Sequence, residues 1–146
     1  MASADTDAVL AALHEVCDAV AAALTRLDDW GLAGTTDGQY RHDLVADRAA
    51  LEVLDAAGLG VVSEESAETD ADRAVVVVVD PVDGSTNASK GLPWWATSVC
   101  ALDAAGPLAA VVANQAIGTR FAAVRGRGAT CDGAPIAPSG VERAGD

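Results

Sequence analysis

The feature that most constrains the fold is a run of valines that ends abruptly in acidic and turn-forming residues. Val75 to Val79 are five consecutive valines, and residues 80–87 then read Asp-Pro-Val-Asp-Gly-Ser-Thr-Asn. β-Branched side chains favour extended structure, and such an apolar run is typical of a buried central strand. The sequence therefore predicts a strand over residues 74–79 that delivers Asp80 to the end of a sheet.

Two carboxylates and several backbone N–H groups follow this predicted strand. Asp80 and Asp83 would repel each other unless a cation lay between them. Pro81 stiffens the exit from the strand, and Gly84 lets the backbone pass close to a ligand. The stretch predicts a divalent cation and a phosphate bound together, the latter by the N–H groups of residues 84–86. Asp-Gly alone is common in ordinary turns, but the whole octapeptide favours a binding site.

Two acidic elements lie upstream of this stretch. Residues 63–66 read Ser-Glu-Glu-Ser at the end of another predicted strand, where a carboxylate could supply a further oxygen ligand. Asp47 lies one turn into a predicted helix and could orient a hydroxyl or a water. Taken alone, each of these acids would be read as solvated surface.

Helical periodicity predicts two helices before the first strand, over 7–29 and 43–57. The residues expected at their ends are Thr6 as N-cap, Gly31 as a stop, Asp43 as the second cap and Gly58 at C′. The apolar face expected for the second helix consists of Leu44, Leu51 and Leu54.

A loop over 34–39, a polar loop after Ser63 and a turn-rich segment over 80–90 separate the remaining elements. Further strands are predicted over 59–63, 95–102, 108–114, 119–124, 128–131 and 134–136, the last two joined by the Asp132-Gly133 hairpin signal. Two helices followed by a run of strands predict an α+β fold, with both helices packed on a mainly antiparallel sheet.

The composition and net charge indicate which kinds of ligand and cellular location suit the chain. The chain has 146 residues and a formal net charge of −13, which argues against binding nucleic acid through a basic surface but suits divalent cations. Three scattered cysteines give neither a disulfide framework nor a zinc spacing. The N-terminus has no basic region typical of a signal peptide, and no apolar run is long enough for a membrane span. We therefore expect a cytoplasmic protein that does not bind membranes.

Several of these segments together resemble the inositol monophosphatase family, which comprises magnesium-dependent, lithium-sensitive sugar and polyol phosphatases. The family pattern is a Gly/Ser-Glu-Glu segment followed by Asp-Pro-hydrophobic-Asp-Gly-Thr/Ser-x-Asn. The matching segments here are Ser63–Ser66 and Asp80–Asn87, supported by Asp43–Asp47, Gly91–Val99 and Gly126–Gly133. The resemblance covers essentially the whole chain and implies the N-terminal half of a layered αβαβα fold.

The resemblance also implies roles for individual residues. Glu64 matches a ligand of the first metal, Asp80 the aspartate that bridges two metals, and Val82 a backbone carbonyl ligand. Asp83 matches the residue that holds the second metal and reaches the substrate hydroxyls. The resemblance therefore implies that two or three Mg²⁺ ions bind and that lithium inhibits the activity.

The expected phosphate-binding N–H groups are those of Gly84 and Ser85. Ser85 and Asp47 match the hydroxyl–carboxylate pair that orients the attacking water, so the catalytic residues implied are Asp47, Glu64 and Ser85. Because the metals would activate water, no protein nucleophile is expected, and His14 and His42 are interpreted as structural or surface residues.

The resemblance implies that residues 1–146 form an N-terminal metal-binding portion that lacks the family's C-terminal half. That half carries a Trp-Asp-x-Ala motif whose aspartate completes the second metal site. We therefore expect impaired hydrolysis of a small phosphorylated polyol or sugar, with a homodimer or pairing with a C-terminal half as possible assemblies.

Two alternatives remain. In a haloacid-dehalogenase-like phosphatase the two aspartates would be two residues apart, the first being a covalent nucleophile, whereas here they are three apart. The non-enzymatic alternative is an inactive metal-binding module that pairs with another chain through an exposed apolar flank.

Overall fold

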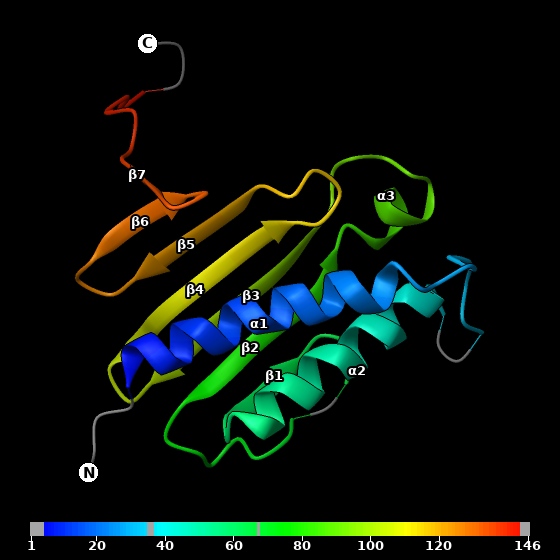
Figure 1. Cartoon of the computed structure of the whole chain (residues 1–146), viewed down its shortest axis with the longest axis horizontal. Helices are drawn as coiled ribbons and strands as arrows, with labels where there is room; N and C mark the ends of the chain where they lie inside the picture. Colours follow the sequence, from blue (N-terminus) through cyan, green and yellow to red (C-terminus); the bar gives the residue numbers. More distant parts are fainter. Residues whose placement is uncertain (1–4, 35–36, 67, 144–146) are drawn as a thin grey trace.

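The computed structural model describes residues 5–34, 37–66 and 68–143 and shows two long helices packed on one sheet (Figure 1). Positions 35 and 36 of the expected 34–39 loop lie outside the described residues. The helices are α1 (Thr6–Leu24), α2 (Arg41–Ala56) and α3 (Ser85–Ser89). The strands are β1 (Gly60–Ser63), β2 (Val76–Asp83), β3 (Ala96–Asp103), β4 (Gly106–Asn114), β5 (Arg120–Val124), β6 (Gly128–Cys131) and β7 (Ala134–Ile136).

The seven strands form one sheet in chain order. β1 and β2 are parallel, and every later neighbouring pair is antiparallel, which confirms the predicted α+β class and the mainly antiparallel sheet. The predicted hairpin between β6 and β7 is present, with positive φ angles at Asp132 and Gly133 as a tight type I′ turn requires. The short helix α3 was not predicted, because its residues lie in the segment expected to be turns.

The core lies between the two long helices and one face of the sheet. α1 packs against α2, β3 and β4, and α2 packs against β1 and β2. Alternate residues of the strands point toward the helices, among them Val77, Val79, Val99 and Val111, all almost fully buried. No helix among the described residues is long and apolar enough to cross a membrane.

The first helix is shorter than predicted. It ends at Leu24, and Asp5 rather than Thr6 is its N-cap, with Asp5 Oδ1 accepting the Asp7 N–H at 3.1 Å. The Thr25 hydroxyl donates to the Ala21 carbonyl, and the next N–H groups bond three residues back, so the helix tightens and stops. Leu27 still packs against the core from the loop, which explains why the apolar periodicity continued past the helix end.

The second helix begins two residues earlier than predicted. Its N-cap is Tyr40, and Asp43 is the third residue of the helix, where Oδ2 accepts the Tyr40 backbone N–H at 2.9 Å. The buried face differs in part from the expected one: Leu54 is buried and Leu51 partly buried, but Leu44 is exposed, and Ala46 and Ala50 complete the buried face. Gly58 lies at C′ with a φ of 71° as predicted.

Candidate functional site

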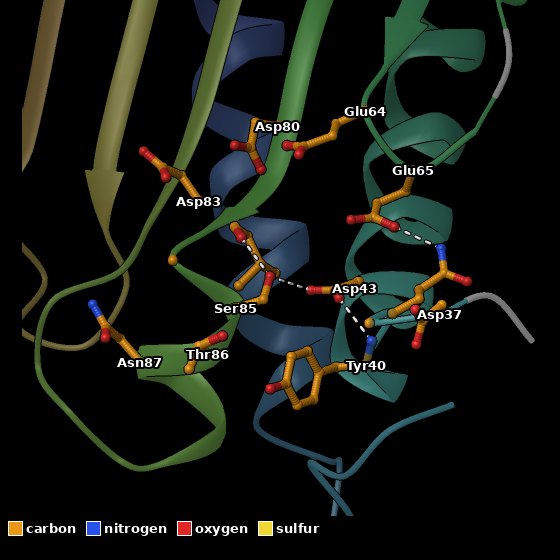
Figure 2. A pocket seen from close by; sticks show the side chains of 14 residues that line it. Asp37, Tyr40, Asp43, Glu64, Glu65, Asp80, Asp83, Ser85, Thr86 and Asn87 are labelled. Carbon is orange, nitrogen blue, oxygen red and sulfur yellow. Dashed lines mark hydrogen bonds between the residues drawn. The ribbon is translucent and has the colours of Figure 1, made fainter. Parts of the chain in front are cut away.

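The parallel pairing of β1 and β2 brings two acidic strand ends together. Ser63 is the register partner of Val79, and the Glu64 N–H donates to the Val79 carbonyl at 3.1 Å. Glu64, directly after β1, and Asp80, inside β2, therefore lie side by side, and their carboxyl groups point toward each other (Figure 2). The predicted strand end at Val79 was wrong, because β2 continues through Asp80 to Asp83.

A β-bulge turns the next part of β2. Asp80 pairs with Ser98 and Asp83 with Ala96, so β2 uses one residue more than β3 over this stretch. Pro81 and Val82 are both buried as a result, whereas the Asp83 side chain is exposed. In Figure 2, Asp80 lies between Asp83 and Glu64. The bulge thus places the Asp80 and Asp83 carboxylates near the end of β2 with their side chains pointing in different directions.

The environment of Asp80 disfavours its charged form. Partial burial, a hydrogen bond with Glu64 and the negative charges of Glu64 and Asp83 together raise the pKa of Asp80 to about 7. In the absence of a cation, the Asp80 carboxyl therefore keeps its proton to a higher pH than an ordinary aspartate does. Burial also raises the pKa of Glu65, whose carboxylate accepts a 2.6 Å hydrogen bond from Gln39.

The carboxylate that lies beside Ser85 is Asp43. The Ser85 hydroxyl is 2.6 Å from Asp43 Oδ1 and 2.8 Å from the Val82 carbonyl, so its proton has two acceptors within reach. The predicted pairing of Ser85 with Asp47 was wrong. Asp47 instead accepts a 2.5 Å hydrogen bond from the Ser63 hydroxyl.

The start of α2 explains this exchange. With Asp43 at the third helical position, its Oδ2 satisfies the Tyr40 N–H while its Oδ1 faces α3. Asp47 lies one turn further along the same buried face and reaches β1 rather than α3. The prediction chose Asp47 from the family resemblance and from its place one turn into the helix, whereas Ser85 contacts Asp43, four residues earlier.

The predicted residues come together around one cavity of about 570 Å³. Its lining includes Glu64, Asp80, Val82, Asp83, Gly84 and Ser85 from the predicted set, together with Asp43. Asp47 is not part of the lining. Glu65, which belongs to the predicted acidic segment 63–66, also lines the cavity. Sequence reasoning missed Gln39 and Tyr40, and their position just before α2 was the only signal for them.

The side chains fit a hard divalent cation by their chemistry. The converging donors are carboxylate oxygens and the Val82 carbonyl, which Mg²⁺ prefers over nitrogen or sulfur. Among the described residues, no three or more acidic, histidine or cysteine side chains are already grouped closely enough to hold a metal ion. In Figure 2, the Glu64 and Asp80 carboxyl groups point toward each other, whereas Asp83 points aside.

His42 is structural in its surroundings, as interpreted. Its ring is fully buried, 5.1 Å from that of Tyr40 and 5.0 Å from that of Trp30. Burial lowers the pKa of His42, and Nε2 lies 3.3 Å from Asp43 Oδ1. The imidazole therefore packs behind Asp43, on the side away from the cavity lining.

The comparisons with known proteins agree with one another. Residues 1–145 match the Inositol monophosphatase family. The chain is 37% identical over 75 residues to the fructose-1,6-bisphosphatase/inositol-1-monophosphatase of Archaeoglobus fulgidus, covering 51% of this chain and 29% of that protein. It is 38% identical over 82 residues to the histidinol-phosphatase of Mycobacterium tuberculosis, covering 55% of this chain and 32% of that protein.

The fold is similar to that of a solved structure. The extragenic suppressor protein suhB of Bartonella henselae superposes with a TM-score of 0.80 at 28% identity, over 93% of this chain and 56% of that one. The chain thus spans about a third of the length of the two curated relatives and about half of that structure.

Proposed function

Because the chain belongs to the inositol monophosphatase family, we propose that its acidic cavity is the catalytic half-site of a magnesium-dependent phosphatase acting on a small phosphorylated polyol or sugar. The observation that carries the proposal is the meeting of the Glu64 and Asp80 carboxyl groups beside the Asp43–Ser85 pair in one cavity. The names of the relatives support a phosphatase of the inositol monophosphatase or fructose bisphosphatase type.

Glu64, Asp80, Asp83 and the Val82 carbonyl would hold the Mg²⁺ ions. Two or three ions and inhibition by lithium follow from the family resemblance. When bound, such ions polarise the phosphoryl oxygens, lower the pKa of a bound water and neutralise the leaving oxygen.

The remaining steps belong to side chains and backbone of this chain. Asp43 is held by the Tyr40 N–H and accepts the Ser85 proton, which leaves an Oγ lone pair to orient the attacking water. The N–H groups of Gly84 and Ser85 would bind the phosphate, and the exposed Asp83 carboxylate would accept hydrogen bonds from substrate hydroxyls. Asp43 takes the role that the sequence analysis gave to Asp47.

A second candidate function rests on the coverage of the relatives. The chain spans 29% and 32% of the two curated relatives, and the remainder of each has no counterpart in the match. In this candidate the acidic cavity would bind Mg²⁺ without turnover, as part of a metal-binding module that pairs with another chain. We also propose that the protein forms a homodimer and is located in the cytoplasm.

Phosphate release from inositol 1-phosphate tests both candidates. We expect release that requires Mg²⁺ and disappears in Asp83→Asn, measured together with the thermal stabilisation of the chain by Mg²⁺ alone. Stabilisation by Mg²⁺ without release above the Asp83→Asn background would favour the inactive module. If Mg²⁺ gave no thermal stabilisation and no phosphate were released, the metal site itself would be refuted.

A further inference from the structure

A second cavity, of about 320 Å³, adjoins the acidic cavity along shared residues. Asp83, Gly84 and Asn87 line both. The rest of the second lining is Trp94, Trp95, Ala96, Val112, Asn114 and Phe121. A ligand whose phosphate was bound at Gly84 would therefore have an apolar surface within reach on the far side of Asp83.

The side chains of Trp94, Val112 and Phe121 form what we call the apolar wall. They are 76%, 40% and 45% exposed and line the same cavity, and exposed apolar groups gathered in this way are typical of binding surfaces. The neighbouring Trp95 behaves differently, because it is half-buried and meets the Trp30 ring edge-on at 5.8 Å. Packing in the described residues thus accounts for Trp95 but not for the exposed indole of Trp94.

The backbone beneath Trp94 is fixed against the candidate phosphate site. Asn87 Nδ2 donates to the Trp94 carbonyl at 2.8 Å, and the Gln115 N–H donates to the Trp95 carbonyl at 3.3 Å. A Cβ at position 84 would lie 3.1 Å from the Trp94 carbonyl oxygen, and Gly84 has a φ of 95°. The loop that carries the indole and the turn proposed to bind phosphate are therefore in direct contact.

From this placement we propose that Trp94 determines substrate specificity by stacking on the ring of a cyclic polyol or sugar phosphate. The inference rests on the proposed function, since it needs the phosphate at Gly84 and Ser85. The C–H face of a saturated ring suits an indole surface, while the ring hydroxyls can donate to the Asp83 carboxylate on the rim. A charged phosphate would lose hydration without gaining hydrogen bonds against the apolar wall. The wall therefore distinguishes substrates by the organic part of the phosphate ester.

Two non-hydrolysable ligands with the same anionic group test this assignment. Methylphosphonate has no ring, and the methylenephosphonate analogue of inositol 1-phosphate carries one. With Mg²⁺ present, calorimetric titration should show tighter binding of the inositol analogue. Trp94→Ala should reduce that preference by about 2- to 12-fold, as expected for an aromatic stacking contact, and leave methylphosphonate binding unchanged. Trp94→Phe should keep most of the preference.

Leu92→Ala is the matched control, because Leu92 is exposed in the same loop but does not line this cavity. An unchanged ring preference in Trp94→Ala would overturn the inference while leaving the proposed function intact. An equal loss in Leu92→Ala would also overturn it, since the loop rather than the indole would then be responsible. If neither phosphonate bound, the proposed function would fail and this inference with it.

Discussion

Asp43 is a buried aspartate whose two carboxylate oxygens each have a hydrogen-bond donor. Its two carboxylate oxygens accept the Tyr40 N–H and the Ser85 hydroxyl, and the side chain is 3% exposed. Asp47, one turn later, is similarly buried but bonded to Ser63. At the residue scale the two aspartates therefore differ in what they touch rather than in burial.

This difference predicts separate effects on catalysis. Asp43→Asn should lower magnesium-dependent phosphate release by about 10²- to 10⁴-fold, the usual loss when a positioned acid–base group is removed. Asp47→Asn should leave the rate within a few-fold of the parent. Both variants should lose roughly 1–3 kcal/mol of unfolding free energy, because each leaves a buried donor poorly paired.

Initial rates of phosphate release, measured below the unfolding transition of the weaker variant, provide the check. Urea unfolding reports the stability of both chains and serves as their common control. A rate loss in Asp47→Asn as large as that in Asp43→Asn would contradict the assignment of the water-orienting role to Asp43.

The raised pKa of Asp80 predicts a pH-dependent stability of the cation-free chain. The unfolded chain releases this proton near the ordinary pKa of 3.8, whereas the folded chain holds it up to about 7. Between these values the folded state binds more protons, so the free energy of unfolding falls as pH rises through that window. Asp80→Asn should remove this contribution and gain stability relative to the parent at alkaline pH.

Urea midpoints with a chelator at about pH 5.5 and about pH 8 measure the effect. The gap between Asp80→Asn and the parent should widen at the higher pH, and Asp72→Asn, an exposed acid of the polar loop, should show no such widening. Added Mg²⁺ should stabilise the parent and not Asp80→Asn. A gap that stays constant with pH would contradict the burial and charge argument.

At the scale of elements, the pattern of side chains predicted most strands but missed the end of α1 and the start of α2. The valine run and the turn residues located the first half of β2 and the strands after it, because period and punctuation are local properties. The end of α1 depends on the Thr25 hydroxyl, and the start of α2 on Asp43 acting at the third helical position. At the start of α2, Asp43 rather than Asp47 contacts Ser85, and nothing in the spacing alone distinguished the two aspartates.

Gly60 is another residue whose importance depends on tertiary contact. It begins β1, and a Cβ there would lie 2.3 Å from the Asp70 carbonyl oxygen, because the polar loop returns along β1 through the Val61–Thr69 bridge. This close approach covers the β1 edge that leads directly to Glu64.

Gly60→Ala should therefore destabilise the chain by about 3 kcal/mol, since the clash is with backbone that cannot rotate away. Gly118→Ala is the matched control: its φ is 82°, but an added Cβ would meet nothing, so its cost should be about 1 kcal/mol. Thermal and urea unfolding give both values. Equal losses would show that the loop simply moves away from β1.

At the scale of the whole molecule, the helices cover only one face of the sheet (Figure 1). On the other face, Val78 is 46% exposed, and the register aligns its row with Cys100 and Ala110. The neighbouring row carries Val112 and Phe121, which are also exposed. This apolar face favours association, whereas a formal net charge of −13 keeps copies of the chain apart.

These opposing effects predict association that depends on salt. Because the Debye length falls from about 10 Å at 0.1 M to about 3 Å at 1 M ionic strength, added salt should weaken the repulsion while leaving the apolar attraction. Sedimentation velocity should show larger species as NaCl is raised. Val78→Lys should suppress them at little cost in stability, since the side chain is half exposed and outside both cavities described above. Leu44→Lys makes the same kind of change at an exposed apolar residue of α2 and should not suppress the larger species. If both variants suppressed them, net charge, and not this face of the sheet, would control association.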